Sequence, residues 1–292
     1  MLGSTKLSLS QRARNEHPTK RFARAEKYLP PVILRIAKYV FADMKYCPRG
    51  WHPRDSRSRG WEDKSIADAQ QRHWPILLQN LQGVGPLGVS HFPWSMTRED
   101  RTDHNVMMSY GYVLARAARK KDRITILDWG GGVGHYYLYS IALVPDVAVT
   151  YDCYDLPHLC RLGRTLLPEV QFHDSLGELV GKKYDLVLNS SSLHYFENWR
   201  EVTAKLAAAA QEYLYIARLQ TVNDAPSFVV LHRVHRAGYS EFQSWFINRE
   251  ELVSRVKESG LELLREFLFT EKWRIRGAPA KVEGRGFLFQ RR

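Results

Sequence analysis

The chain has 292 residues, of which 44% are hydrophobic, so it is long enough to bury a full core and its composition excludes a disordered protein. A formal net charge of +12 favours acidic partners such as nucleic acid, anionic lipid or phosphorylated substrates. Three cysteines without a CxxC pair exclude a disulfide framework and suit a reducing cytoplasm, where we expect the protein to reside.

Residues 1–120 are predicted to form a helical cap, with no strand before Ile124. The excess of basic residues at positions 12–27 indicates a solvated helix face more than a nucleic-acid site, because no aromatic residues interleave with it. Residues 32–41 are apolar at helical spacing but are too short and too charged for a membrane span. Further helices are expected over 65–81, where Pro75 must kink the helix or begin a new one, and over 105–120.

From Ile124 onward, short apolar runs alternate with helical patterns. The expected strands are 124–128, 147–154, 170–173, 183–189 and 213–217, and the expected helices are 136–143, 159–167, 199–212 and 249–259. Residues 261–269 and 286–290 suit a closing antiparallel pair. The alternation predicts an α/β domain over residues 121–292, with a Rossmann-like, doubly wound sheet and an antiparallel last strand.

The first of these strands ends in Asp128 and runs into a glycine-rich turn, residues 130–134, that opens a helix. Glycines let the backbone turn tightly and approach a ligand closely, which is typical of nucleotide sites. Asp155 ends the second strand, where a carboxylate can accept hydrogen bonds from both hydroxyls of a ribose. The alternative for Asp155 is a helix cap before Pro157.

The ends of the third and fourth strands meet the same edge of the sheet, where open sheets bind ligands. Asp174 could meet an adenine amino group there, or serve only as a cap. The residues expected to contact a cofactor are Asp128, Gly130, Gly132, Gly134, His135, Asp155, Leu156, Asp174, Ser175, Asn189 and Ser190.

This ordered set resembles the class I S-adenosylmethionine-dependent methyltransferases over residues 122–292. The segment 154–158 is similar to the Asp-Leu-Pro segment of small-molecule O-methyltransferases, whose acid holds the ribose, and Leu193-His194 is similar to the stretch with their catalytic histidine. A group of bacterial methyltransferases associated with surface-polysaccharide gene clusters shares the Asp-x-Gly-Gly turn, the Ser-Ser-x-Leu-His-Tyr segment and a later Trp-Phe pair. Two features depart from the O-methyltransferases: Tyr195 stands where they have aspartate, and no methionine follows Asp174.

The resemblance implies S-adenosylmethionine as cofactor and a small molecule or glycan as acceptor. Transfer from a sulfonium is an in-line displacement, and His194 is the candidate general base for a hydroxyl acceptor, against an ordinary loop histidine. No Asn-Pro-Pro-Tyr motif of amino-directed enzymes follows the fourth strand, which favours oxygen as the acceptor atom.

The long segment 220–247 is interpreted as a lid over the site, with a surface hairpin as the alternative. The residues expected to contact the acceptor are Tyr110, His232, His235 and Trp245.

Other functions remain open at this point. The acceptor atom could be nitrogen, or the substrate could be nucleic acid, although that is not favoured. A nicotinamide oxidoreductase would need a Tyr-x-x-x-Lys pair, which we do not find, and a nucleotide-fold binding protein without catalysis is the non-enzymatic alternative. A homodimer is possible, since helical caps of related enzymes often dimerise. No metal is expected, because Cys153, His158 and Cys160 lack a second ligand pair with zinc spacing.

Overall fold

The computed structural model of the chain describes residues 44–52, 60–88, 101–234 and 240–292. The expected helix of residues 32–41, the basic segment 12–27 and His235 lie outside the described residues.

The main sheet runs in the order β4-β3-β2-β5-β6-β11-β9. Strands β2 to β6 pair in parallel, whereas β11 is antiparallel to both of its neighbours, β6 and β9. The bounds are β2 Arg123–Trp129, β3 Ala148–Tyr154, β4 Gln171–His173, β5 Tyr184–Ser190, β6 Ala210–Val222, β9 Leu261–Phe269 and β11 Val282–Arg291. The predicted doubly wound sheet with an antiparallel last strand is confirmed, and its order reverses between β2 and β5.

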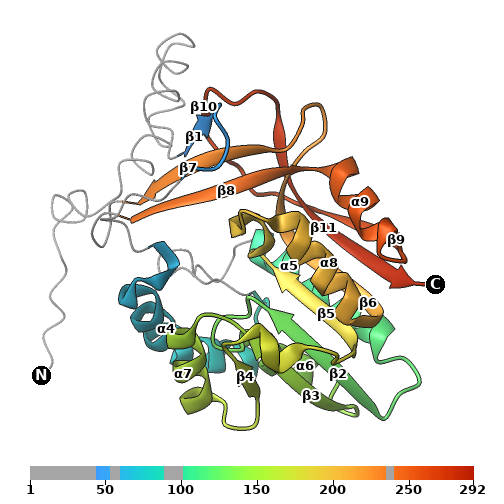
Figure 1. The fold of residues 1–292 in the computed structure, drawn as a ribbon. Coiled ribbons are helices and arrows are strands. Elements are labelled where there is room, and N and C mark those ends of the chain that lie inside the picture. The colour runs from blue at the N-terminus through green and yellow to red at the C-terminus, as the bar shows by residue number, and fades with distance from the viewer. Residues whose placement is uncertain (1–43, 53–59, 89–100, 235–239) are drawn as a thin grey trace, which may run out of the picture.

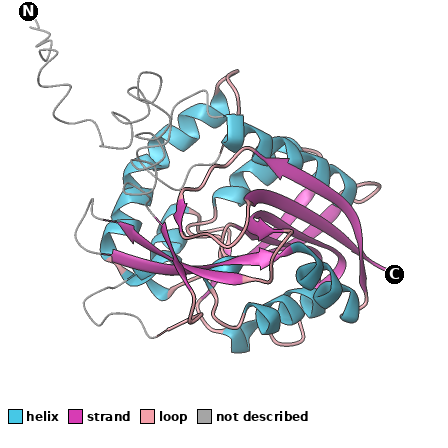
Figure 2. Ribbon diagram, turned by 90° about the horizontal axis from the view of Figure 1, so that it is seen from above, coloured by secondary structure: helices cyan, strands magenta, loops and turns pink. Residues whose placement is uncertain are grey.

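Helices cover both faces of this sheet (Figure 2). Side chains of α4 to α7 share one buried cluster with β2 and β3, and side chains of α8 and α9 share another with β5 and β6. The bounds are α4 Lys64–Gln82, α5 Arg101–Ala117, α6 His135–Leu143, α7 Pro157–Leu166, α8 Trp199–Ala209 and α9 Arg249–Glu258. Among the described residues, no helix is both long enough and apolar enough to cross a membrane.

Helix α4 is a single helix through Pro75, where the sequence indicated a kink or a new helix. Pro75 lies at an exposed position, while Trp74 and Leu77 are buried in the core. Proline removes one backbone hydrogen bond, and the burial of the two large side chains offsets that loss. At its start, the side chain of Asp63 caps α4 by accepting from the backbone N–H of Ser65 at 2.9 Å.

A second group of strands, in the order β10-β1-β7-β8, lies beside the main sheet. Their bounds are β1 Met44–Cys47, β7 Phe228–Val234, β8 Ser240–Asn248 and β10 Ile275–Arg276. The prediction of no strand before Ile124 is therefore wrong. Strand β1 has only four residues and pairs with β7 and β10, which lie far along the chain, so no local pattern could reveal it.

The segment 220–247 contains an antiparallel hairpin of β7 and β8. The hairpin joins the main sheet through two residue pairs, Thr221 with Ile247 and Val222 with Asn248. Figure 1 shows both strands crossing above the arrowheads of β2 and β5, which are the carboxyl ends of these strands. The segment is thus a hairpin with buried side chains on both strands, over the edge where open sheets bind ligands, and its role as a lid stays a prediction.

Candidate active site

The glycine turn joins the end of β2 to the start of α6. Gly130, Gly132 and Gly134 have φ values of +80°, +63° and +85°, in the left-handed region that favours glycine. A Cβ on Gly131 would lie 2.3 Å from a carboxylate oxygen of Asp128, so this position also excludes a side chain. The turn is buried from Gly131 to Gly134, and its lack of side chains lets neighbouring groups approach the backbone at the point where the strand order reverses, just before the N-terminus of α6.

Asp155 holds this turn from the end of β3. Its Oδ2 accepts a hydrogen bond from the backbone N–H of Gly132 at 2.6 Å, and its Oδ1 accepts one from the N–H of Leu156 at 2.7 Å. The N-cap of α7 is Leu156, so the capping alternative for Asp155 is wrong. Burial raises the pKa of the Asp155 carboxyl above its ordinary value, and the two backbone donors oppose that shift.

Asp128 lies beneath the same turn and is fully buried. Its Oδ2 accepts a hydrogen bond from the Tyr151 hydroxyl at 2.8 Å, while its Oδ1 has no hydrogen-bond partner among the described residues. Burial, and then the negative charge of Asp155, raises the pKa of Asp128 to about 7. The carboxyl therefore changes charge near neutral pH.

The segment after β5 is fastened to the turn by polar side chains. Nδ2 of Asn189 donates to the backbone oxygen of Trp129 at 3.0 Å and to Oγ of Ser192 at 2.7 Å, and that hydroxyl donates to the same Trp129 oxygen at 3.0 Å. Ser190 shares a 2.9 Å hydrogen bond with the hydroxyl of Tyr136. Asn189 and Ser190 thus position the edge of the site. Ser192, just after β5, packs against the turn at Gly130, although it was not among the residues expected to contact a cofactor.

His194 lies in a 3-10 turn, Leu193–Tyr195, and is 1% exposed. Its ring centre is 4.3 Å from that of Tyr195, and its Nδ1 has no hydrogen-bond partner in the described part of the chain. Burial, and then the positive charge of Arg218, lowers the pKa of His194 to about 3. The imidazole is therefore neutral at physiological pH.

Arg218, at the end of β6, is a buried cation that sequence reasoning missed. Its guanidinium lies 3.2 Å from Oδ1 of Asp103 on α5 and 2.8 Å from Oε1 of Glu271 after β9. The residue has φ +50°, a backbone conformation that costs a non-glycine residue about 1–2 kcal/mol and that tends to occur at functional sites. Arg218 therefore ties three elements together beside His194.

Replacing Arg218 by methionine is expected to lower the free energy of unfolding by about 3–5 kcal/mol, because the buried Asp103 and the partly buried Glu271 lose their ion pair. Urea unfolding measures the loss. Arg292→Met is the matched control: its ion pair with Glu262 lies at the surface and contributes under about 1 kcal/mol. Equal losses in the two variants would contradict the role of Arg218.

His135 begins α6 and is buried against α4. Its ring centre lies 5.6 Å from that of Trp74, and burial lowers its pKa to about 4. The neighbouring residue on the buried face of α4, Gln70, lies against the turn at Gly132. Helix α4 therefore covers the turn, although it belongs to the segment that the sequence predicted only as a cap.

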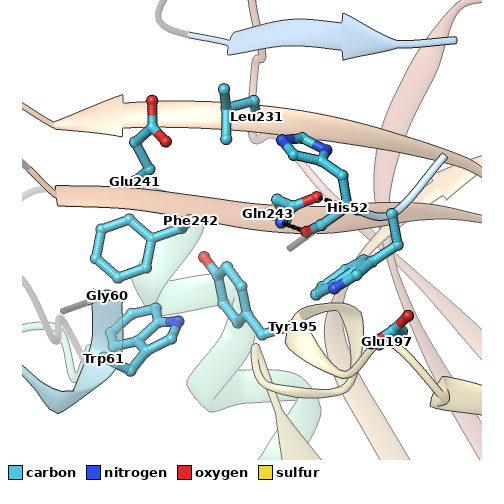
Figure 3. Close-up of a pocket in the computed structure, with 10 residues that line it drawn as sticks. His52, Gly60, Trp61, Tyr195, Glu197, Leu231, Glu241, Phe242 and Gln243 are labelled. Carbon is cyan, nitrogen blue, oxygen red and sulfur yellow. Dashed lines mark hydrogen bonds between the residues drawn. The ribbon is translucent and has the colours of Figure 1, made fainter. Parts of the chain in front are cut away.

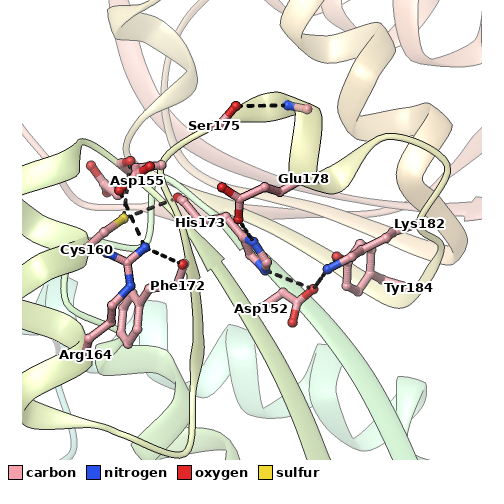
Figure 4. A network of polar contacts seen from close by, with 12 residues as sticks. Asp152, Asp155, Cys160, Arg164, Phe172, His173, Ser175, Glu178, Lys182 and Tyr184 are labelled. Carbon is pink, nitrogen blue, oxygen red and sulfur yellow. Dashed lines mark hydrogen bonds and ion pairs between the residues drawn. The ribbon is translucent and has the colours of Figure 1, made fainter.

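Two residues expected to contact the cofactor, Asp174 and Ser175, directly follow β4, and Figure 4 shows Ser175. A carboxylate oxygen of Asp174 lies 3.5 Å from the guanidinium of Arg164, at the surface. Oγ of Ser175 accepts from the N–H of Gly177 at 3.3 Å and so caps the short helix Leu176–Leu179. Ser175 has a structural role in this position, whereas Asp174 stays at the edge where a ligand could meet it.

Two cavities border this edge. One, of about 670 Å³, lies between α4 and α7 beside the end of β3. Its lining includes Leu156, Pro157 and His158 on one side and Lys64, Ala67 and Gln71 on the other. The position next to Asp155 suits the nucleoside part of a cofactor.

The other cavity, of about 340 Å³, lies between the β7–β8 hairpin and the turn that follows His194. Figure 3 shows its aromatic side chains, Trp61, Tyr195 and Phe242, gathered on one side, with Glu241 and Gln243 on β8. The ring centre of Trp61 lies 4.9 Å from those of both Tyr195 and Phe242. Flat aromatic walls with a few polar groups are typical of small-molecule sites.

Of the residues expected to contact the acceptor, the structure places Trp245 and His232 near the aromatic cavity and Tyr110 in the core. The rings of Trp245 and Trp51 stack at 6.1 Å, and Trp51 lines the aromatic cavity. His232 lies on β7 with its ring centre 6.5 Å from that of Phe242. Tyr110 is fully buried, and its hydroxyl shares a 2.6 Å hydrogen bond with Ser140, which gives it a packing role in the core.

A metal site is not formed by the described residues, among which no three His, Cys, Asp or Glu side chains gather to hold an ion. Cys160 donates instead to the backbone oxygens of Asp155 and His173, at 3.3 and 3.2 Å.

Comparison with known proteins gives structural likenesses only. No protein-family model matches the sequence. No curated protein sequence matches it either.

Among solved structures, the chain is similar to a 1,6-didemethyltoxoflavin-N1-methyltransferase from Burkholderia thailandensis with bound S-adenosylhomocysteine, at 15% identity and a TM-score of 0.46 over 82% of this chain and 92% of that one. It is also similar to an O-methyltransferase family protein from Burkholderia thailandensis, at 19% identity and a TM-score of 0.44 over 89% and 83%. A third is an S-adenosylmethionine-dependent methyltransferase from Clostridium acetobutylicum, at 11% identity and a TM-score of 0.43 over 65% and 93%.

Proposed function

We propose that the chain is a class I S-adenosylmethionine-dependent methyltransferase that acts on a small molecule or glycan. The observation that carries the proposal is the pair of acids, Asp128 and Asp155, in contact with the glycine turn at the reversal point of the sheet. S-adenosylmethionine carries positive charge on its sulfonium and ammonium groups, which two carboxylates attract. A dinucleotide would instead bring a negatively charged pyrophosphate to the turn, which the Asp128 carboxylate beneath the turn would repel.

The rest of the proposed cofactor site follows from this pair. Asp155 would exchange its hydrogen bond to Gly132 for the hydroxyls of the ribose, and the N-terminus of α6 at His135 would face the carboxylate of the methionine part. Asp174 and Leu156 would border the adenine, beside the cavity between α4 and α7.

We propose the aromatic cavity as the acceptor site and oxygen as the acceptor atom. The reaction is an in-line displacement in which the bond from methyl carbon to acceptor oxygen forms, the carbon–sulfur bond breaks and its electron pair stays on sulfur. The acceptor hydroxyl loses its proton in the same step. The neutral imidazole of His194, whose Nδ1 has no hydrogen-bond partner among the described residues, is the proposed base, next to the cavity wall at Tyr195. Because its pKa is about 3, it would take the proton only as the new bond to carbon forms, when the hydroxyl becomes strongly acidic.

The function is tested first by calorimetry with S-adenosylmethionine, S-adenosylhomocysteine and NAD. We expect micromolar binding of both sulfur compounds and none of NAD. Binding of NAD without S-adenosylmethionine would overturn the proposal in favour of an oxidoreductase. Release of S-adenosylhomocysteine in the presence of phenols, sugars and amines then separates an enzyme from a binding protein.

Replacing His194 by glutamine is expected to lower kcat on a hydroxyl acceptor by about 10²–10⁴-fold, because proton removal is lost. The dissociation constant of S-adenosylmethionine should stay within about twofold, since binding of the cofactor does not need the base. His73→Gln is the matched control, because His73 lies on α4, hydrogen-bonds the backbone oxygen of Ala69 and lines neither cavity. Unchanged turnover in the His194 variant would contradict the role and favour an amine or carboxylate acceptor, which needs only positioning.

A further inference from the structure

The buried face of α4 has one polar member. Positions 69, 70, 74 and 77 of this helix face inward, and they hold Ala69, Gln70, Trp74 and Leu77. Gln70 is 6% exposed, and it stands one turn before Trp74, which packs on His135. Burying an amide on such a face lowers the stability of the protein unless the amide forms hydrogen bonds.

The Gln70 amide is aimed at the glycine turn. A Cβ on Gly132 would lie 3.1 Å from Oε1 and 3.4 Å from Nε2 of Gln70, so the amide borders the space that a side chain at this glycine would need. The backbone N–H of the same glycine is taken by Asp155. Gln70 and Asp155 therefore approach Gly132 from two elements that are far apart in the sequence.

Oε1 of Gln70 has no hydrogen-bond partner among the described residues. A buried acceptor without a partner destabilises a protein by roughly 1–3 kcal/mol, and a partner that arrives with a ligand recovers that energy. The amide can both donate and accept, so it can meet a hydroxyl, an ammonium or a carboxylate.

We infer that Gln70 is a further cofactor-binding residue, whose amide hydrogen-bonds a polar group of S-adenosylmethionine on the glycine turn, and that α4 covers the bound cofactor. This inference rests on the proposed function. It assigns to the N-terminal segment a direct part in cofactor binding, beyond that of a cap over the acceptor.

The test replaces Gln70 by methionine, which keeps the length and shape of the side chain and removes the amide. The free variant is expected to melt at the wild-type temperature or above it, since an unpaired polar atom is gone. Its dissociation constant for S-adenosylhomocysteine, measured by calorimetry, should rise about 5- to 100-fold, and the rise in Tm that this ligand causes should shrink. Gln79→Met is the control: Gln79 lies on the exposed face of α4, and its variant should bind as the wild type does.

The outcomes separate the two proposals. If the wild type binds S-adenosylhomocysteine and the Gln70 variant binds it equally well, Gln70 is a packing residue and the inference fails while the proposed function stands. If the wild type binds neither S-adenosylhomocysteine nor S-adenosylmethionine, both fail. If Gln70→Met lowers the Tm of the free protein, Gln70→Ala is measured beside it, and wild-type affinity in that variant overturns the inference as well.

Discussion

Replacing Asp155 by asparagine is expected to raise the dissociation constant of S-adenosylmethionine by about 100-fold, which is about 2.7 kcal/mol. The carboxylate accepts two short backbone hydrogen bonds, from Gly132 and Leu156, and asparagine has one oxygen where two acceptors are needed. The amide nitrogen would face a backbone N–H, so the turn loses its support from β3. The proposed acceptor of the ribose hydroxyls is lost at the same time.

Calorimetry with S-adenosylmethionine and S-adenosylhomocysteine measures this loss, and thermal unfolding with each ligand checks it independently. Asp146→Asn is the matched control, because Asp146 is an exposed aspartate in the turn before β3, at the opposite edge of the sheet. An Asp155 variant that binds within threefold of the wild type would show that the contact between Asp155 and the turn is structural only.

Asp128→Asn is expected to have two opposite effects. Folding raises the pKa of Asp128 from 3.8 to about 7. Because the folded state holds this proton more tightly, the free energy of unfolding is highest below about pH 4 and falls as the pH rises through 7. The loss amounts to roughly 4 kcal/mol, because each pKa unit corresponds to about 1.4 kcal/mol. Asparagine keeps an oxygen for the Tyr151 hydroxyl and never ionises, so the variant should unfold at higher urea than the wild type at pH 8.

The second effect is on the cofactor. The wild type should bind S-adenosylmethionine more weakly at pH 6 than at pH 8, because protonation removes a negative charge near a cationic ligand. The asparagine variant should bind more weakly than the wild type at pH 8, with an affinity that hardly changes between pH 6 and pH 8. Calorimetry at three pH values measures this, with Asp122→Asn as the control, an exposed aspartate just before the same strand. A variant that is both more stable and equally tight at pH 8 would exclude Asp128 from the cofactor site.

The parts of the site that the sequence predicted are local. The glycine turn and Asp155 stand at strand ends, where the apolar run before them fixes their place at the edge of the sheet. The sequence placed Asn189 and Ser190 at the correct edge for the same reason. Their side chains, however, hydrogen-bond the backbone of Trp129 and the hydroxyl of Tyr136 and do not point into an open site.

The parts that were missed depend on contacts between distant segments. Arg218 forms its ion pairs with Glu271, 53 positions later, and with Asp103 on α5, so its role cannot be read from its own segment. Gln70 is one polar position in an amphipathic helix, and only packing shows that it faces Gly132. Strand β1 was not predicted for the same reason. Five residues after it, the backbone of His52 and the side chain of Gln243, 191 positions apart, exchange two hydrogen bonds. Propensity over four residues is weaker than such tertiary context.

The narrow link between the hairpin and the main sheet has a consequence for how such a protein can diverge. Two residue pairs of the ladder, Thr221 with Ile247 and Val222 with Asn248, and the hydrogen bond from Ser244 to Gln220 join β8 to β6. The walls of the aromatic cavity come mostly from β7, β8 and the residues around β1, whereas the acids that contact the glycine turn come from β2 and β3. Substitutions or insertions in the hairpin can therefore reshape what enters the cavity without moving the acids. Under the proposed function, selection could thus change which acceptor binds while the proposed cofactor site stays constant.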